Sequence, residues 1–346
     1  MDTMTNHAAS PGRPGTYHSG EARSGGPQVA HRPAALPHMS AGAATRDLFL
    51  TDGGLETSLI YLQDVDLPDF AAFPLVGTEE GRGQLRRYYE PYVRLARHTG
   101  RGLVLDTPTW RASADWGAGL GYDRADLAAA NEAAVSLVAD IASAAVDVTT
   151  VLNGTVGPRG DGYVVGETMS VEEAAEFHSL QAEAFAAAGA DLVTAVTMTY
   201  PEEGAGVALA ARAAGLPAVV GLTVETDGRL PNGMPLGEAV AAVDALTDGS
   251  SAYLMINCAH TSHIERGLTE GAPWLDRIGA VRANASQLSH AELDAATTLD
   301  RGDVGGLARD YVALRDRLPH LRVVGGCCGT DHQHVAAIAA ALAQAS

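Results

Sequence analysis

Three cysteines are the residues of this chain best suited to chemistry: Cys258 stands alone, and Cys327 and Cys328 are adjacent in a glycine-flanked stretch. A free cysteine is often a small buried hydrophobic residue. An adjacent pair between glycines fills a core poorly, because glycine packs nothing and neighbouring strand residues point to opposite faces. The odd number of cysteines also disfavours a structural disulfide. Three soft ligands with no fourth predict a zinc site that keeps one position open for substrate.

The elements that must position these thiols read as repeated βα units, because short apolar runs alternate with alanine-rich stretches of helical period. Eight strands are expected, at residues 48–52, 102–109, 148–154, 191–199, 218–225, 252–258, 278–283 and 321–325. Eight helices are expected, at residues 79–98, 124–144, 171–188, 202–214, 236–246, 262–268, 304–318 and 332–343. This pattern predicts a single (β/α)8 TIM barrel over residues 46–346. A doubly wound sheet would need a glycine fingerprint that Gly53-Gly54 does not supply.

In such barrels the active site lies at the C-terminal ends of the strands. Cys258 ends the sixth run and Cys327 and Cys328 follow the eighth, so we expect all three on one rim as metal ligands and catalytic groups. The flanking glycines are expected to let the backbone turn until both neighbouring sulfurs face one ion. Other polar residues expected on this rim include Asp52, Glu56, Asp106, His260 and Arg282. His260 is kept out of the metal shell, because a histidine bonded to its own loop is at least as common.

The composition limits partners and location. There are 42 Asp and Glu residues against 23 basic ones, all arginine, and the formal net charge is −19. Nucleic acids and anionic membranes need a basic surface, so neither is expected as a partner. No signal peptide or long uninterrupted apolar segment is evident, so we expect a reducing cytoplasmic setting that keeps the thiols free. Residues 1–45, rich in Pro, Gly, Ser, Ala and His, are expected to be a disordered tail.

Zinc held by thiolates is a weak Lewis acid, and its natural use is to bind and deprotonate an incoming thiol. The pKa of that thiol falls from about 8.5, so that a thiolate nucleophile is present at neutral pH. The cysteines therefore predict attack by sulfur on an activated methyl group.

Several stretches resemble the zinc-dependent homocysteine S-methyltransferase family: Gly-Gly-Cys-Cys-Gly-Thr at 325–330, Asn257-Cys258 at a strand end, and Asp52-Gly53-Gly54 at the start of the barrel. The resemblance covers residues 48–343. It implies a zinc site of the three cysteines, with the acceptor thiolate as fourth ligand. It also implies that substrate is contacted by Asp52, Gly53, Gly54, Thr109, Asn153 and Asn257.

Two positions depart from the family pattern. Val196 stands where the family carries a glutamate, in a Glu-Thr-Ile-Pro-like stretch, that binds the amino group of homocysteine. A valine cannot pair with an ammonium group, so either Glu225, one strand along, supplies the charge or the acceptor is another molecule. Arg282-Ala283-Asn284-Ala285 replaces a common Tyr-Pro-Asn-Ser-like run.

The methyl donor is inferred from what the chain lacks. It ends soon after the eighth helix, which leaves no room for cobalamin or folate domains or for a betaine-type oligomerisation arm. We therefore expect a sulfonium donor, S-methylmethionine or S-adenosylmethionine, and homocysteine as the first-choice acceptor, giving methionine. A different thiol or selenol acceptor is the alternative. More distant ones are a non-enzymatic zinc-binding barrel and a phosphate site at Gly325-Gly326. An aldolase-like Schiff base is excluded because the chain has no lysine. The oligomeric state stays open.

Overall fold

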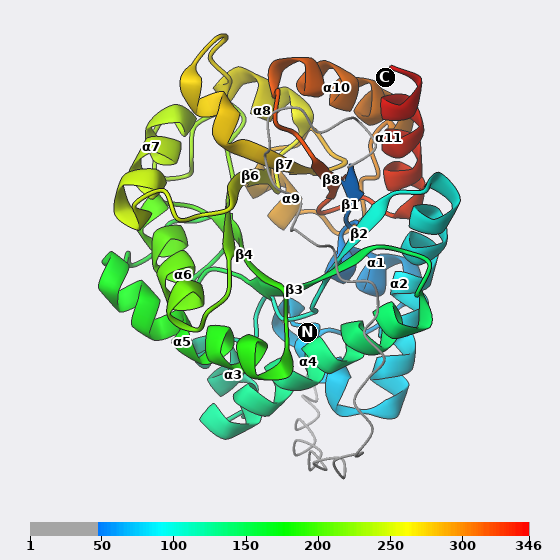
Figure 1. The fold of residues 1–346 in the computed structure, drawn as a ribbon, viewed down its shortest axis with the longest axis vertical. Coiled ribbons are helices and arrows are strands. Elements are labelled where there is room, and N and C mark those ends of the chain that lie inside the picture. The colour runs from blue at the N-terminus through cyan, green and yellow to red at the C-terminus, as the bar shows by residue number, and fades with distance from the viewer. Residues whose placement is uncertain (1–47, 346) are drawn as a thin grey trace, which may run out of the picture.

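Eight parallel strands close into a barrel in chain order, which confirms the predicted TIM barrel (Figure 1). The computed structural model describes residues 48–345, and the predicted tail at residues 1–45 lies outside them. The strands are β1 Phe49–Leu50, β2 Gly102–Asp106, β3 Thr150–Val156, β4 Leu192–Met198, β5 Ala218–Leu222, β6 Tyr253–Asn257, β7 Ile278–Ala283 and β8 Val323–Gly326. The ring closes where β1 pairs with β8, Phe49 lying opposite Val323. Each predicted strand is present, although several end earlier than expected.

The eight predicted helices form the outer layer: α2 Glu79–Thr99, α4 Arg124–Ala144, α5 Val171–Ala188, α6 Pro201–Ala213, α7 Leu236–Thr247, α8 Thr261–Gly267, α10 Val304–Arg317 and α11 His332–Gln344. Local signals set their ends. At the start of α5, Ser170 and Glu173 form the predicted capping box, and Gly189 ends the helix with φ 84°. The sequence did not predict three shorter helices, α1 Leu55–Gln63, α3 Ala114–Gly119 and α9 His290–Asp294.

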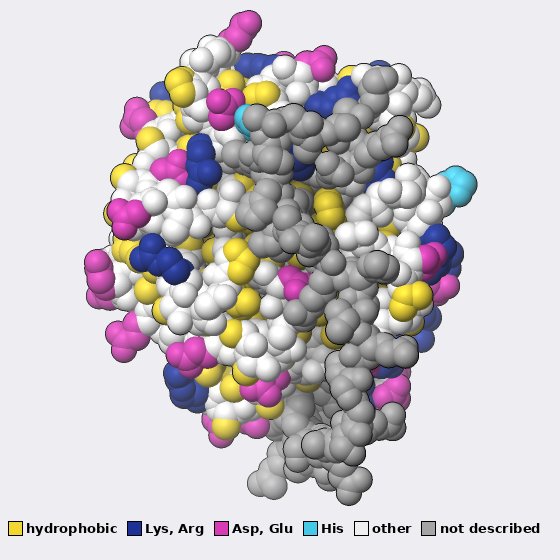
Figure 2. Space-filling view, viewed as in Figure 1, with side chains coloured by type: hydrophobic (Ala, Val, Ile, Leu, Met, Phe, Trp, Pro, Cys, Tyr) yellow, Lys and Arg dark blue, Asp and Glu magenta, His cyan; other side chains and the backbone are white. Residues whose placement is uncertain are grey.

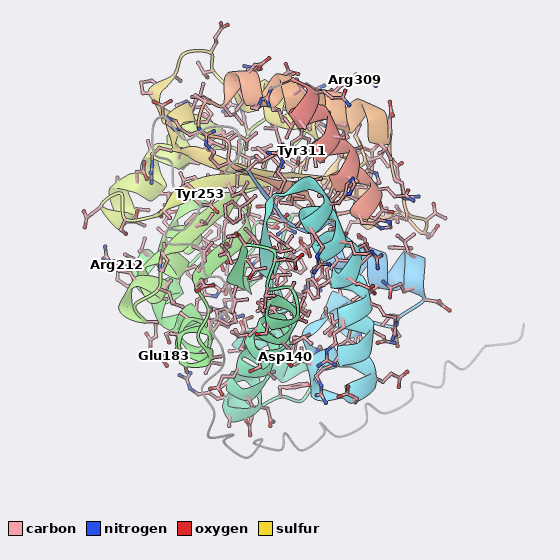
Figure 3. The ribbon with its side chains drawn as sticks, turned by 45° about the vertical axis from the view of Figure 1, so that its right-hand side comes forward. Asp140, Glu183, Arg212, Tyr253, Arg309 and Tyr311 are labelled. Carbon is pink, nitrogen blue, oxygen red and sulfur yellow. The ribbon has the colours of Figure 1, made fainter. Side chains whose placement is uncertain are left out.

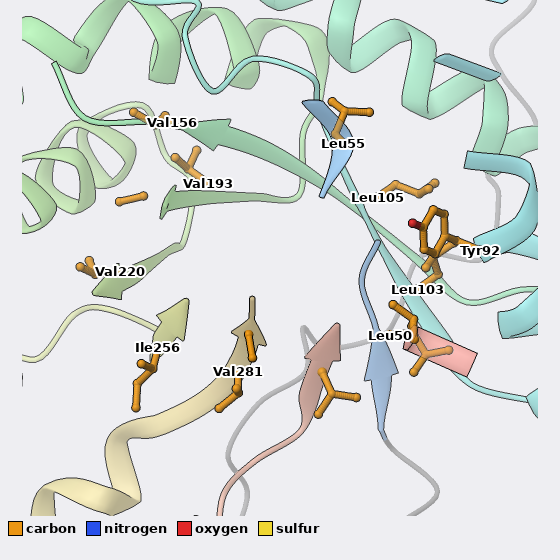
Figure 4. Packing of buried hydrophobic residues seen from close by; sticks show 14 of the residues in the cluster. Leu50, Leu55, Tyr92, Leu103, Leu105, Val156, Val193, Val220, Ile256 and Val281 are labelled. Carbon is orange, nitrogen blue, oxygen red and sulfur yellow. The ribbon is translucent and has the colours of Figure 1, made fainter. Parts of the chain in front are cut away.

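The strands carry two cores, because successive side chains point to opposite faces of the sheet. Outward residues such as Leu50, Leu105 and Val193 pack against the helices (Figure 4). Alternate residues, Phe49, Val104 and Leu192 among them, form a separate cluster with members from seven other strand positions inside the barrel. The inner cluster fills the barrel below its rim, so a ligand can enter only above it.

Helix α10 is tied to the strands that carry the site. The hydroxyl of Tyr311 donates a hydrogen bond to Gly325 O at 2.6 Å and accepts one from Ala283 N at 2.9 Å (Figure 3). Tyr311 is fully buried, so these bonds fix the ends of β7 and β8 relative to each other.

The outer surface is acidic overall but has no single charged area on the face that Figure 2 shows, where Asp, Glu and Arg side chains are scattered. Helix α4 is long and apolar enough to cross a membrane by length and composition. It nevertheless begins with a capping box at Asp123 and buries one face against its neighbours in the barrel. The capping box and the buried face are those of a helix that packs against a protein core.

Candidate functional site

The three cysteines meet at the rim, as expected. Their sulfur atoms lie within 4.8 Å of one another, and Cys258 Sγ is 3.7 Å from Cys328 Sγ. Tetrahedral zinc with Zn–S bonds of about 2.3 Å places its sulfur ligands about 3.8 Å apart. The donor set and its spacing therefore fit a zinc ion. His260 stays outside this cluster, because its Nδ1 accepts a hydrogen bond from Ser262 N at 3.1 Å.

Cys258 is aimed into the site by a backbone turn at the end of β6. Its φ is 57°, in the left-handed region that a non-glycine residue rarely adopts. The turn is held by hydrogen bonds from Cys258 N to Arg282 O at 3.0 Å and from His290 Nε2 to Cys258 O at 2.8 Å. The strained conformation places the thiol in the cavity.

Cys327 and Cys328 lie in a turn after β8. Cys327 O accepts hydrogen bonds from Thr330 N at 3.1 Å and from Thr330 Oγ1 at 2.8 Å. The expected reason for the preceding glycines is wrong: Gly329 alone in this stretch has a positive φ, 79°. Gly325 and Gly326 instead provide space, because a Cβ there would lie 1.9 Å from Thr51 Oγ1 and from Thr330 Oγ1, respectively.

The thiols share their protons unequally. Hydrogen bonds from the two neighbouring thiols hold the pKa of Cys327 well below its usual range, and the Arg282 guanidinium lowers it further. Hydrogen bonding to Cys327 raises the pKa of Cys258. Tyr163, which the sequence did not predict, places its hydroxyl 3.3 Å from Cys258 Sγ and 3.4 Å from Cys328 Sγ. The cluster is thus set to carry negative charge at Cys327 first.

A cavity of about 370 Å³ opens above the cysteines, a size suited to a small molecule. Aromatic side chains form much of its wall: Tyr61, Phe70, Tyr89, Trp110 and Tyr163. Charged side chains also line it: Asp52, Glu56, Asp106, Arg111, Asp161, Arg282, Asp294 and Asp300. The excess of acids over arginines favours a cationic ligand.

Arg282 on β7 organises the bottom of this cavity. Its guanidinium contacts the carboxylates of Asp52 and Asp106, and its Nε donates to Gly326 O at 3.0 Å. Tyr88 donates a hydrogen bond to Asp52 Oδ2 at 3.0 Å. Burial raises the pKa of Asp52 to about 7, although Arg282 lowers it. Asp52 is therefore engaged before any substrate arrives.

Of the predicted substrate contacts, Asp52, Gly53 and Gly54 line the cavity. Neither glycine has room for a side chain: a Cβ at Gly53 would lie 2.7 Å from Thr330 O, and one at Gly54 would lie 2.7 Å from Cys327 O. The β1–α1 turn is thus packed directly against the cysteine turn.

Four other predicted contacts lie outside the lining, and each has a partner within the protein. Thr109 donates to Thr155 O at 2.7 Å. Asn153 donates to Asp106 Oδ1 at 2.7 Å, and Asn257 donates to Thr197 Oγ1 at 2.9 Å. Glu225 Oε1 lies 2.9 Å from His290 Nδ1. These side chains support the site from outside the cavity lining, and their contact with substrate stays a prediction.

Glu225, the predicted replacement for the missing family acid, is held by His290, and its contact with the acceptor stays a prediction. Its partner His290 stacks on Tyr163, with ring centroids 4.1 Å apart, so Glu225 supports the tyrosine from behind. Val196 does line the cavity, beside Thr197, whose φ of 66° marks a bulge in β4. The wall at this point is apolar.

Comparison with known proteins agrees with the fold. Residues 49–342 match the sequence model of the homocysteine S-methyltransferase family. The metallated form of the homocysteine methyltransferase MmuM from Escherichia coli is 25% identical, covers 85% of this chain and 96% of its own, and gives a TM-score of 0.65. Its oxidised form is 26% identical with the same coverage and TM-score. No curated protein sequence matches. The family match spans most of the barrel, and the chain belongs to the homocysteine S-methyltransferase family.

Proposed function

We propose that this chain is a zinc-dependent methyltransferase that moves a methyl group from a sulfonium donor, S-methylmethionine or S-adenosylmethionine, to a thiol. Homocysteine is the first-choice acceptor, which places the enzyme in methionine biosynthesis. The observation that carries this proposal is the cluster of three thiols opening into a small-molecule cavity. Family membership and the similarity to an Escherichia coli homocysteine methyltransferase support it.

Cys258, Cys327 and Cys328 would hold the zinc ion, and the proton-sharing among them suits a soft cation that binds thiolates. When bound, zinc lowers the pKa of a thiol that coordinates it, which supplies a nucleophile at neutral pH. A metallated form among the similar structures supports a metal at this site. A reducing compartment such as the cytoplasm suits an enzyme that needs three free thiols.

The chain's own groups would position the reactants. The Tyr163 hydroxyl donates a hydrogen bond to Cys328 Sγ at 3.4 Å and lies 3.3 Å from Cys258 Sγ. The aromatic wall of Phe70 and Trp110, with Asp161 and Asp294, suits the positive charge of a sulfonium. In the reaction a bond forms between the acceptor sulfur and the methyl carbon. The bond from that carbon to the donor sulfur breaks, its electron pair stays on the donor as a neutral thioether, and the acceptor's proton passes to solvent.

A second acceptor class is supported by two observations. Val196 offers no charge to an ammonium group, and Asp52 is paired with Arg282. Another thiol or a selenol therefore stays as the alternative to homocysteine.

The test is methyl transfer by zinc-loaded protein, measured by mass spectrometry with each donor and a panel of thiols that includes homocysteine. We expect methionine from homocysteine and no product with Cys328→Ala, whose folding is checked by circular dichroism. The proposal fails if no thiol is methylated, or if full activity survives complete removal of zinc.

A further inference from the structure

The charged side chains of the cavity divide into groups that are already satisfied and groups that are not. Asp52 and Asp106 are paired with Arg282. Asp161 accepts hydrogen bonds from the backbone of the 163–164 segment, and Asp300 accepts one from Ser286 Oγ at 2.6 Å. These carboxylates have partners without a ligand, and Asp294 is exposed to solvent.

Glu56 and Arg111 differ. Within residues 48–345 no ion pair joins either side chain to an opposite charge, although both line the same cavity. Arg111 donates to Asp69 O, but its Nε is buried without a partner. Its guanidinium lies 3.9 Å from the ring centroid of Trp116 and 4.9 Å from that of Trp110, which fixes its position. A buried guanidinium nitrogen without a partner indicates a missing acceptor.

Glu56 is placed beside the cysteines by the first turn of α1. Gly54, just before that helix, packs against Cys327 O, and Thr57 Oγ1 accepts a hydrogen bond from Gly329 N at 3.2 Å. Burial raises the pKa of Glu56 to about 7, and the nearby negative charge of Cys327 adds to the shift. A cation beside Glu56 would relieve this cost by favouring the ionised carboxylate.

We propose that Glu56 and Arg111 bind the α-ammonium and the α-carboxylate, respectively, of the amino acid whose thiol is methylated. The inference rests on the proposed function and specifies how this chain holds its acceptor. Two opposite charges that share a cavity without pairing match a zwitterion, and Glu56 lies in the helix turn that packs against Cys327 and Gly329. In homocysteine the nitrogen is separated from the sulfur by the α-carbon and two methylene groups. With Val196 apolar and Asp52 engaged by Arg282, Glu56 takes the role of ammonium partner.

The test uses zinc-loaded protein and three acceptors: homocysteine, 4-mercaptobutanoate without the ammonium, and 3-mercaptopropylamine without the carboxylate. A hydrogen bond to a charged group increases binding affinity about 10- to 100-fold. We expect Glu56→Gln to raise KM for homocysteine by about that factor and to leave KM for 4-mercaptobutanoate nearly unchanged. Arg111→Gln should raise KM for homocysteine equally and spare 3-mercaptopropylamine. Glu183→Gln, at an exposed position on α5 (Figure 3), is the matched control.

Calorimetric titration with methionine gives a second readout that needs no turnover. Wild type should bind methionine, and Glu56→Gln and Arg111→Gln should each bind it about 10- to 100-fold more weakly. The inference is overturned if either variant binds methionine like wild type, if wild type does not bind it, or if Glu56→Gln affects all three acceptors equally. If the wild type methylates homocysteine, any of these results contradicts only the roles of Glu56 and Arg111 and leaves the proposed function intact. Absence of methyl transfer to every thiol, with methionine binding as expected, would contradict the proposed function alone.

Discussion

Arg282 is the residue whose removal tests the charge arrangement of the site most severely. It lies on β7, is 8% exposed, and joins the carboxylates of Asp52, two residues after β1, and Asp106, at the end of β2. Removing one partner of a buried ion pair costs about 3–5 kcal/mol, because the remaining charge is left without compensation. We expect Arg282→Met to lower the free energy of unfolding by about that amount near pH 8.

The pH dependence of this loss has a definite sign. Without Arg282 the pKa of Asp52, already about 7, rises further, since burial and Asp106 both raise it. The folded variant then holds a proton that the unfolded chain releases, so its stability falls as pH increases. The loss should therefore be largest near pH 8 and shrink toward about pH 5, where the carboxyl group is neutral in the folded state.

Urea unfolding followed by circular dichroism at several pH values measures this effect. Arg309→Met, which removes an exposed arginine on α10 (Figure 3), is the matched control and should leave the unfolding midpoint unchanged. Adding Asp106→Asn to Arg282→Met should restore part of the stability. A loss below about 1 kcal/mol near pH 8, or one that grows as pH falls, would refute the reasoning.

Three further outcomes follow from the geometry. Gly326→Ala should lower the free energy of unfolding by about 1–3 kcal/mol and reduce bound zinc in metal analysis, because the new Cβ would lie 1.9 Å from Thr330 Oγ1. Gly119→Ala, where the Cβ meets open space, is the control, and equal behaviour of the two variants would contradict this reasoning. Glu225→Gln should change KM for the acceptor by less than about threefold, because its carboxylate contacts His290 outside the cavity. A rise in KM as large as that of Glu56→Gln would instead indicate that Glu225 contacts the substrate. Methionine binding, measured by calorimetry, should strengthen as pH rises through about 7, where Glu56 ionises beside Cys327, Arg282 and Arg111. Glu56→Gln should abolish this pH dependence, and pH-independent binding by the wild type would contradict the prediction.

The fold was readable from the sequence because its signals are local. Parallel strands buried on both faces form apolar runs, and all eight were found. The bounds of α5 were predicted correctly, since Ser170 and Gly189 mark its ends chemically. The second and fifth runs were predicted too long: β2 ends at Asp106 and β5 at Leu222, although Thr107 N and Thr223 N still donate to the neighbouring strands, at Asn153 O and Met198 O. Helix α9 was missed although Ser289 and Glu292 form a capping box at its start, whereas α1 has no side-chain cap.

In the site, too, the sequence predicted what depends on strand order and missed what depends on side-chain pairing. The cysteine site was predicted because the topology of the barrel brings the C-terminal ends of all strands to one rim, independently of side-chain contacts. Substrate contacts depend on which side chain finds which partner: Arg282 pairs with Asp52, and Asp106 holds Asn153. One signal was available, since Arg282 is a charged residue within a fully buried strand. Tyr163 and Arg111 lie in loops, where no periodicity shows which residues face the cavity.

X-ray absorption spectroscopy at the zinc edge tests the central claim most directly, because it counts the sulfur atoms around the metal. For zinc-loaded protein we expect three sulfurs at about 2.3 Å and a fourth lighter ligand, and four sulfurs after homocysteine is added. Cys328→Ala should lose one sulfur or the metal itself. Fewer than three sulfurs in the wild type, or a spectrum that no thiol acceptor changes, would contradict a three-cysteine zinc site that activates the acceptor.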